Sequence, residues 1–441
     1  MRRSKAMDVV IVGGGIGGLT LAISLHQAGV PCQVFEGAAE IKALGLGINL
    51  LPHAVRELTE LGLQKELGRV AVETRELNFY NRHGQFIHSE PRGRRAGYDW
   101  PQFSIHRGDL QLVLLNAVRE RTGADRVHVG YKCVRVNQDE NGVTAFFGDG
   151  ESTSRSCQGS IAIGCDGIHS VVRHQLYPDE GPLHYAGVNM WRGAARIPSF
   201  LTGASMVLVG SLRTGKMVIY PIRKLDPLGM QLVNWVAEIE SVQRHELAEN
   251  RAAQLGDFFS AYKDWAFGWL DVAALIRKTE NVLEFPMVDR DPLPRWSFGR
   301  LSLLGDAAHP MYPMGSNGAG QAIIDARMLA GELRRARDPR DALAPYEAAR
   351  REPTSKLVLL NRTMPPDGLL TEVDRRTGGN RFNDISAVIS KQEIAGIFQH
   401  YAQVSNVDKA KLHAAASLDA PLRKNRISVV TAPRPEVLGF K

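Results

Sequence analysis

The sequence predicts an α/β protein with two domains and an additional helical element toward the C-terminal end. Three observations predict it. The chain has 441 residues, more than the roughly 250–300 at which a single hydrophobic core usually stops growing. Residues 8–36 follow a strand, helix, strand pattern, whereas strand patterns dominate residues 188–239. Beyond residue 365 the patterns are helical, around residues 385–401 and 408–416.

The N-terminal unit is a Rossmann-like βαβ motif. Its pattern predicts a short buried strand over residues 8–12, a helix over 16–28 that Gly29 ends, and a second strand over 31–35. Such a unit opens many nucleotide-binding domains, so the turn between its first strand and its helix is the first place to look for a ligand.

That turn is rich in glycine. Gly13, Gly15 and Gly18 form Gly-x-Gly-x-x-Gly, in which the first glycine permits a tight turn, the second lets a pyrophosphate approach the backbone, and the third lets helix and strand pack closely. The helix N-terminus adds free N–H groups and the positive end of its dipole. Glu36, after the second strand, can accept hydrogen bonds from a ribose diol. A turn without a ligand is the alternative, but the order of these features favours a dinucleotide, either FAD or a nicotinamide.

Two pairs of residues later in the sequence favour FAD over a nicotinamide. Asp166-Gly167 and Gly305-Asp306 each follow a predicted strand. Asp306 can accept a hydrogen bond from a ribityl hydroxyl, and Gly305 keeps the backbone open to a cofactor. Ordinary turn chemistry also explains either pair taken singly. The preceding strands are predicted at residues 160–163 and 301–304.

The chain continues from Gly305-Asp306 through Pro313 and Gly318 into a helix with Asp325 in its first turns. A helix N-terminus that points at an isoalloxazine ring would stabilise negative charge at the N1/O2 edge, the charge that a reduced flavin acquires.

Together, the glycine turn, Asp166-Gly167 and Gly305-Asp306 resemble the fingerprint set of the group A, single-component FAD-dependent aromatic monooxygenases, the family of p-hydroxybenzoate and salicylate hydroxylases. The resemblance covers roughly residues 7–365. It implies bound FAD, NADH or NADPH and O2 as co-substrates, and hydroxylation of an aromatic carbon through a flavin C4a-hydroperoxide. It also implies a GR2-type Rossmann-like FAD-binding domain with an inserted β-sheet substrate domain. The expected divisions are residues 1–175 and 285–365 for the FAD-binding domain, 176–284 for the substrate domain with the 70–100 hairpin region contributing, and 366–441 for the helical C-terminal extension.

The resemblance also assigns cofactor contacts. Glu36 becomes the ribose ligand, Arg107 a contact to the phosphate and ribityl region, and Asp306 the ribityl partner. Asp166 and Arg173 belong to a motif that serves both FAD and the nicotinamide. Many relatives carry an arginine before the flavin-facing turn, where this chain has residues 43–49 without one. The full implied set is Gly13, Gly15, Ile16, Gly17, Gly18, Glu36, Gly47, Ile48, Arg107, Asp166, Gly167, Arg173, Gly305, Asp306, Pro313, Gly318, Ala319 and Gly320.

Several stretches, including residues 190–193 and 312–315, resemble the branch of this family that contains 5-methylphenazine-1-carboxylate 1-monooxygenase. The expected substrate is therefore an aromatic or N-heteroaromatic molecule, such as a carboxylated phenazine. Pro313 would lie beside flavin C4a. Candidate residues for stacking the substrate ring are Trp191, Tyr220 and Trp235, with Arg192 or His106 for a carboxylate or phenolate; Pro313, Trp191 and Tyr220 are the catalytic candidates.

Composition limits the other function classes. The net charge is +7, but basic residues are scattered and not interleaved with aromatics, so we expect no nucleic-acid partner. The four cysteines lack Cys-x-x-Cys spacing, so we expect neither a metal site nor a disulfide framework. Glycines interrupt the apolar run after the charged residues 1–5, which argues against a signal peptide or a membrane span and for a cytoplasmic protein. We expect the protein to be a monomer or a homodimer.

A related alternative is an FAD-dependent dehydrogenase or reductase that inserts no oxygen, because it could share all three motifs. Flavin halogenases usually carry a Trp-x-Trp-x-Ile-Pro segment, and Baeyer–Villiger enzymes a second dinucleotide motif, and the sequence contains neither.

Overall fold

The computed structural model describes residues 8–42, 46–148, 153–241, 251–363, 367–404 and 409–414. The N-terminal residues 1–5, residues 43–45 of the turn that departs from the family pattern, and the prolines at 365 and 366 lie outside the described residues.

A parallel sheet forms the centre of the nucleotide-binding half. Its order among the described residues is β21-β12-β1-β2-β8, and every neighbouring pair is parallel. The strands are β1 (Val9–Val12), β2 (Cys32–Glu36), β8 (Val127–Val129), β12 (Ile161–Gly164) and β21 (Leu301–Leu303). The four strands predicted here are confirmed to within a residue at each end. Parallel strands need crossover connections, and these bring the strand ends that carry the glycine turn, Asp166 and Asp306 to one edge of the sheet.

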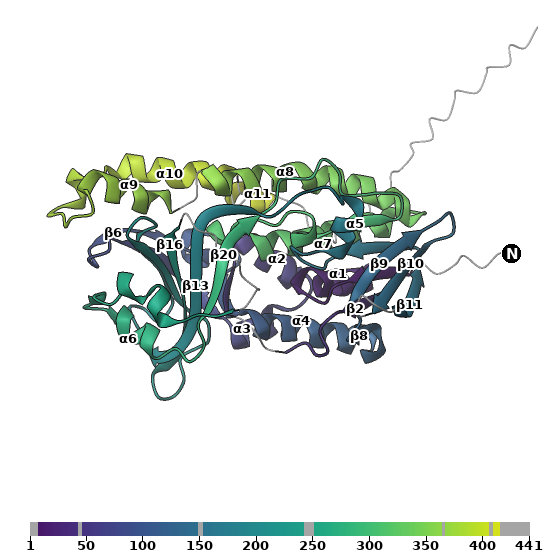
Figure 1. The fold of residues 1–441 in the computed structure, drawn as a ribbon, viewed down its shortest axis with the longest axis horizontal. Helices are drawn as coiled ribbons and strands as arrows, with labels where there is room; N and C mark the ends of the chain where they lie inside the picture. Colours follow the sequence, from purple (N-terminus) through teal and green to yellow (C-terminus); the bar gives the residue numbers. More distant parts are fainter. Residues whose placement is uncertain are drawn as a thin grey trace, which may run out of the picture.

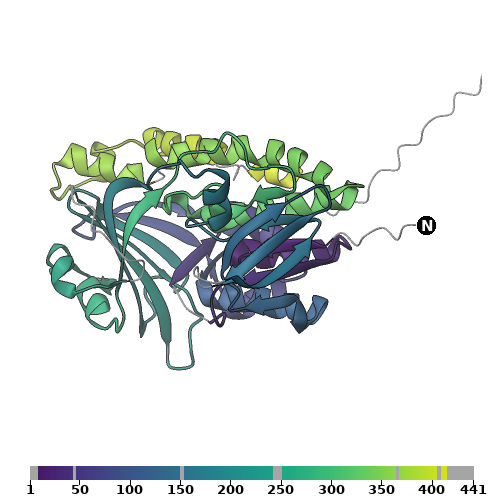
Figure 2. The same cartoon turned by 45° about the vertical axis from the view of Figure 1, so that its right-hand side comes forward.

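Helices surround this sheet (Figures 1 and 2). α1 (Ile16–Gln27) packs between α4 (Arg107–Thr122) and α7 (Gly318–Arg335). Because α1 is flanked on both sides, its apolar residues are buried nearly all round, as in a fully internal helix. Smaller elements complete this half: α2 (Pro52–Glu60), α3 (Gln64–Val70), α5 (Val171–Leu176), the sheet β3-β7-β4 (Gly47–Leu50, Gln102–His106, Val72–Thr74) and the sheet β11-β10-β9 (Thr153–Gly159, Val143–Gly148, Cys133–Gln138).

A second, larger sheet lies beside the first half, at the left of Figure 1. Its order among the described residues is β17-β20-β13-β16-β15-β14-β5-β6. The predicted 70–100 region enters it because β5 pairs in parallel with β14. The strands are β5 (Glu76–Tyr80), β6 (Phe86–Pro91), β13 (His184–Pro198), β14 (Ser205–Ser211), β15 (Gly215–Pro221), β16 (Met230–Glu240), β17 (Arg251–Ala252) and β20 (Leu283–Asp289). Domain boundaries at 175, 284 and 365 stay a prediction.

The two faces of this sheet are buried by different segments. On one face Trp191 and Trp235 pack with Phe258 and with α6 (Val272–Arg277). On the other face, Met206 and Leu208 pack with the C-terminal helices. Side chains alternate between faces along a strand, so Met190 and Arg192 lie on the face opposite to Trp191.

The C-terminal extension crosses the top of Figure 1 as helices. α8 (Leu343–Thr363) leads from the nucleotide-binding half to α9 (Gly368–Thr377), which contacts β14. α10 (Lys391–Val404) and α11 (Lys409–Ala414) follow. The predicted helices at 385–401 and 408–416 are confirmed in part, because residues 385–387 form a separate 3-10 turn and residues 408, 415 and 416 lie outside the described residues. The sequence analysis missed α9.

A buried carboxylate ties the pieces of the nucleotide-binding half together. Asp325 in α7 is fully buried. It accepts hydrogen bonds from Gly305 N at 3.1 Å, His309 Nε2 at 2.6 Å and Arg350 Nε at 2.6 Å. Burial alone would raise the pKa of Asp325, but His309 and Arg350 lower it to about 2. One side chain thus fixes the turn after β21 to both α7 and α8.

Removing this charge tests that role. Because the folded pKa lies below the ordinary 3.8, Asp325 contributes stability that is present above about pH 4 and is lost as the pH falls toward 2. Asp325→Asn should lower the free energy of unfolding at pH 7 by about 3 kcal/mol, because it leaves the buried guanidinium of Arg350 without its carboxylate partner. Urea unfolding measures it. Asp338→Asn, which removes an exposed pair with Arg340, is the control and should change little; equal effects of the two substitutions would contradict the assignment.

Candidate active site

The glycine turn has the geometry that a dinucleotide requires. Gly13 has φ +109°, and a Cβ there would lie 2.4 Å from the carbonyl oxygen of Cys165. A Cβ on Gly18 would lie 2.0 Å from Gly13 O. A Cβ on Gly15, in contrast, would meet nothing within 4 Å. Two glycines therefore allow close packing of the backbone, and the third leaves open space at the N-terminus of α1, where a phosphate would approach.

Glu36 lies where the sequence predicts a ribose ligand. Its Oε2 accepts a hydrogen bond from Gly14 N at 2.7 Å, and its Oε1 accepts one from Ala38 N at 2.8 Å. These bonds fix the carboxylate beside the glycine turn. A carboxylate has about four lone-pair positions, so capacity for a diol remains. Gln111 of α4 donates to Gly14 O at 2.9 Å and holds the turn from the other side.

The Arg173 assignment needs correction, whereas Asp166 has a capping role and its predicted contact with the cofactor stays a prediction. The carboxylate of Asp166 accepts hydrogen bonds from Ser170 Oγ at 2.5 Å and Val171 N at 2.8 Å, so it caps α5. Arg173 is only 1% exposed. Its Nη1 donates to the carbonyl oxygens of Ala307 at 3.1 Å and Ala308 at 2.9 Å, and its Nη2 and Nε bind Glu180. The described residues thus occupy the guanidinium, and Arg173 positions the Gly305-Asp306 segment rather than touching a cofactor.

Asp306 stands at the entrance of α7. A Cβ on Gly318 would lie 3.9 Å from Asp306 Oδ1, so the carboxylate faces the helix N-terminus. The side chain is exposed to solvent, yet it sits in a concave region dense in protein atoms, and this desolvation raises its pKa, against the charges of His309 and Arg107. Asp306 thus lies close to Arg107 and to the start of α7, which carries Ala319 and Gly320. The contacts of these residues with the ribityl chain and ring of FAD stay a prediction.

Gly47 has a structural role in addition to its predicted contact with the cofactor. A Cβ there would lie 2.7 Å from both Tyr220 Cε2 and Asn234 Cγ. Gly47 N donates to Asn234 Oδ1 at 2.7 Å, and Arg192 Nη2 donates to Gly47 O at 3.1 Å. β3, with Gly47 and Ile48, therefore joins the larger sheet directly, and the tight approach requires glycine.

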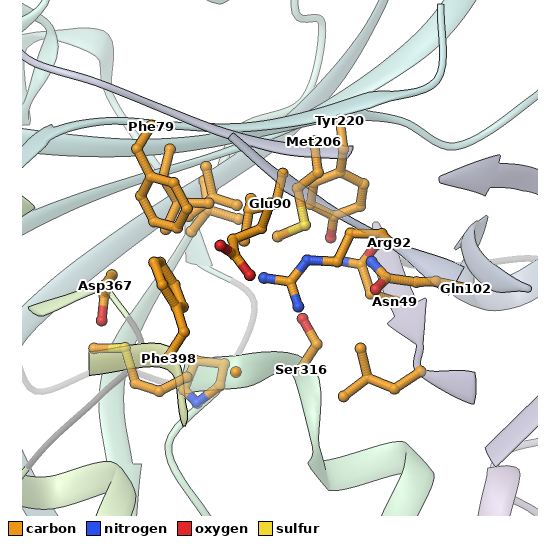
Figure 3. A pocket seen from close by; sticks show the side chains of 18 of the residues that line it. Asn49, Phe79, Glu90, Arg92, Gln102, Met206, Tyr220, Ser316, Asp367 and Phe398 are labelled. Carbon is orange, nitrogen blue, oxygen red and sulfur yellow. The ribbon is translucent and has the colours of Figure 1, made fainter. Parts of the chain in front are cut away.

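A cavity of about 260 Å³ opens between the larger sheet, the turn at Pro313 and the C-terminal helices. Its walls are mainly apolar, and polar side chains gather at two places (Figure 3). Arg92 points into it between Glu90 and Ser316, near Asn49 and Gln102. The apolar wall includes Leu77, Phe79, Met190, Met206, Leu208, Val218, Val236, Met314 and Phe398.

The structure separates the predicted substrate residues. Tyr220, Arg192 and Pro313 line the cavity. Trp191 and Trp235 do not appear among the described residues that line it. Their rings lie on the opposite face of the sheet, stacked on Phe258 at centroid distances of 5.1 Å and 5.9 Å. The stacking role predicted for both residues and the catalytic role predicted for Trp191 are therefore wrong. Strand alternation explains the error, because position 192 faces the cavity and position 191 cannot.

His106 also lies outside the described cavity lining, so its predicted contact with a substrate carboxylate or phenolate is wrong. It is buried at the end of β7, with its Nδ1 3.6 Å from Asp109. Arg192 lines the cavity, and a second arginine, Arg92, enters it as well; no pattern in the sequence predicted a substrate role for Arg92. The sequence carried no signal for the cavity roles of Phe79, Lys216, Asp367 and Phe398.

The glycine turn, Glu36, Asp306 and the N-terminus of α7 have the chemistry that a flavin dinucleotide would need, and they accompany an apolar cavity. Comparison with known families matches residues 6–360 to the FAD binding domain, and the chain belongs to this family. It is an FAD-dependent aromatic monooxygenase that uses O2 and a reduced nicotinamide.

Individual relatives agree. The chain is 44% identical over 370 residues to phenazine 1,6-dicarboxylic acid hydroxylase PhzS of Lysobacter antibioticus, covering 82% of this chain and 91% of that protein. It is 31% identical over 370 residues to 6-hydroxynicotinate 3-monooxygenase of Pseudomonas fluorescens, covering 80% and 90%. A crystal structure of a variant of Klebsiella pneumoniae HpxO complexed with FAD superimposes with a TM-score of 0.71 at 25% identity, covering 91% and 100%.

The described residues contain neither a helix that could cross a membrane nor a cluster of metal-ligating side chains. None of their helices combines the length and apolar character needed to cross a membrane. Nor do these residues bring three or more His, Cys, Asp or Glu side chains together where a metal ion could bind.

Gly15 offers a clean test of the phosphate site. Its backbone has φ −74° and ψ −172°, which is outside the left-handed region, and the Cβ of Gly15→Val would meet nothing within 4 Å. The variant should fold with an unchanged unfolding temperature as apoprotein but purify without FAD, as its visible spectrum would show. Gly13→Ala is the contrasting variant, since its Cβ meets backbone, and should lower stability. A fully flavin-loaded Gly15→Val protein would overturn the site.

A substitution at Asp306 tests the predicted contact with the ribityl chain of FAD. Asp306→Ala should raise the dissociation constant for FAD about tenfold or more, because a charge-assisted hydrogen bond is lost. Titration of apoprotein with FAD, followed by flavin fluorescence, measures the change. Asp341→Ala, an exposed aspartate beyond the other end of α7, is the control. Equal affinities of all three proteins would show that Asp306 belongs only to a turn.

Proposed function

We propose that the chain hydroxylates a planar, carboxylated N-heteroaromatic substrate of the phenazine class. The observation that carries the proposal is the cavity, which combines broad apolar walls with the cations Arg92 and Arg192 beside the turn at Pro313. A fused aromatic acid has matching chemistry, with apolar faces and one anionic edge. The similarity to PhzS of Lysobacter antibioticus supports this substrate class.

The fit to FAD rests on the open space at Gly15 and on the donors and acceptors around Glu36 and Asp306. When bound, FAD supplies the redox chemistry that accepts electrons from NADH or NADPH and activates O2. The residues of this chain supply orientation and exclusion of water. The apolar wall excludes water from the cavity, and this exclusion favours oxygen transfer to the substrate over release of hydrogen peroxide.

Arg92 is the proposed anchor for the substrate carboxylate. A guanidinium has five donors in a planar fork, so one edge can face Glu90 while another binds a carboxylate. Arg192 is held by Gly47 O and Tyr220, and its buried Nε has no partner among the described residues. It therefore also suits an anionic or carbonyl group.

Tyr220 is proposed as a hydrogen-bond donor rather than a base. Burial raises the pKa of Tyr220 to about 12, with Arg192 acting in the opposite direction. The phenol therefore stays protonated near neutral pH, and it can orient a polar group of the substrate. Pro313 is proposed to shape the backbone beside the flavin ring.

We further propose a cytoplasmic protein that is a monomer or homodimer and binds no nucleic acid. The four cysteines, all within the described residues, are free thiols, which suits a reducing compartment. Many described basic residues are engaged in ion pairs with carboxylates, as Arg327 is with Glu57 and Glu60, which leaves fewer cations to follow a phosphate backbone.

The test of function is oxygen incorporation. Purified holoprotein with NADH or NADPH should consume O2 faster when phenazine-1-carboxylate is added, and 18O2 should label the product. Arg92→Gln should lower kcat/KM for the acid about tenfold to hundredfold while FAD content stays normal. Arg94→Gln, which removes an exposed pair with Glu73, is the matched control. Oxidised product without 18O would favour the dehydrogenase or reductase, and no stimulation by any carboxylated N-heteroaromatic would refute the proposed substrate class.

A further inference from the structure

A buried charge cluster forms part of the cavity wall. Lys216 of β15 is 3% exposed, and its ammonium pairs with Glu238 Oε2 of β16 at 2.7 Å and with Asp367 Oδ2. All three side chains line the cavity. Asp367 directly precedes α9, beyond residues 6–360 that match the family model. The C-terminal extension therefore brings an ionisable group to the cavity wall.

The cluster has more acceptors than donors. One ammonium faces two carboxylates, and burial raises the pKa of Glu238, against the charge of Lys216. Asp367 is 6% exposed, and its Oδ1 is buried with no hydrogen-bond partner among the described residues. An unpaired buried acceptor is costly. A group that donates a hydrogen bond to Asp367 Oδ1 from within the cavity would remove that cost.

The acceptor lies away from the cationic end of the cavity. Figure 3 shows Asp367 on the side of Phe79 and Phe398, whereas Arg92, Asn49 and Gln102 lie on the other. A planar substrate whose carboxylate faces Arg92 therefore directs its remote ring toward Asp367. Phe398 comes from α10, so the extension supplies both an aromatic wall and the acceptor at this end.

We propose that Asp367 is a specificity residue that accepts a hydrogen bond from a proton-bearing group, a hydroxyl or N–H, on the substrate ring remote from the carboxylate. The inference deepens the proposed function, on which it rests, by naming a second recognition group on the substrate. Lys216 holds Asp367 Oδ2 and so orients Oδ1 toward the ligand.

Asparagine at position 367 should present a hydrogen-bond donor to the cavity, where Asp367 presents an acceptor. In Asp367→Asn the amide oxygen must accept the hydrogen bond from the Lys216 ammonium, because an ammonium can only donate hydrogen bonds. The NH2 group then replaces Oδ1 and faces the cavity as a donor. The variant should prefer a substrate with an acceptor, such as a carboxylate, where the wild type prefers a donor.

The experiment compares three probes that share a 1-carboxylate on phenazine and differ at position 6: hydroxyl, methoxy and carboxylate. Dissociation constants are measured with holoprotein from the change in flavin absorbance, so binding is read without turnover. The wild type should bind the hydroxyl probe at least tenfold more tightly than the methoxy probe, which cannot donate. Asp367→Asn should lose that preference and shift the hydroxyl-to-carboxylate ratio at least tenfold toward the carboxylate.

Asp374→Asn is the matched control. Asp374 lies on α9 and pairs with Arg213 at 2.7 Å outside the cavity, so the variant loses the same charge and a comparable tether and should keep the wild-type ratios. Unchanged ratios in Asp367→Asn, or an equal shift in Asp374→Asn, would overturn the inference.

Failure of the proposed function would give results that differ from those of a failed inference about Asp367. If the wild type binds the probes but none stimulates O2 uptake, the proposed reaction is wrong, and the binding ratios still judge Asp367. If the wild type hydroxylates the hydroxyl probe and Asp367→Asn retains its preference for that probe over the methoxy one, the function stands and the inference falls. Binding of none of the probes would overturn both, since each requires this cavity to accept a phenazine acid.

Discussion

The buried carboxylate of Asp325 is the interaction on which the arrangement of the site depends. It binds the backbone of Gly305, the ring of His309 and the guanidinium of Arg350. These partners belong to the turn after β21 and to α8, while Asp325 itself belongs to α7. Charge-assisted hydrogen bonds in a region without water are strong and directional. The position of Asp306 at the start of α7 follows from them.

A second constraint joins the cofactor half to the substrate cavity. Gly47 touches Tyr220 and Asn234 so closely that a Cβ would not fit, and Arg192 donates to its carbonyl oxygen. The approach couples β3, which contributes to the predicted flavin contacts, to the strands that line the cavity. The substrate would thus lie next to the flavin because two sheets meet at a glycine.

The sequence predicted most of the nucleotide-binding half because its constraints are local. Gly13 and Gly18 must be glycine for steric reasons, and Glu36 and Asp306 follow strands whose apolar patterns are clear. The cavity depends on long-range placement. Trp191 and Arg192 are neighbours in sequence, and only the register of β13 determines which one faces the ligand. No pattern in the sequence predicted a cavity role for Arg92. Arg173 was predicted to contact the cofactor, although its guanidinium binds Glu180 and the backbone oxygens of Ala307 and Ala308. Asp367 and Phe398 enter the cavity from a helical extension without any motif.

The central claim is that FAD and an aromatic acid bind side by side, with the flavin ring between the N-terminus of α7 and the cavity. A crystal structure of the holoprotein with phenazine-1-carboxylate tests it most directly. The account predicts a pyrophosphate at Gly15, the isoalloxazine ring beside Pro313 and the carboxylate at Arg92. A flavin ring or an aromatic acid bound outside this cavity, with Arg92 untouched, would contradict it.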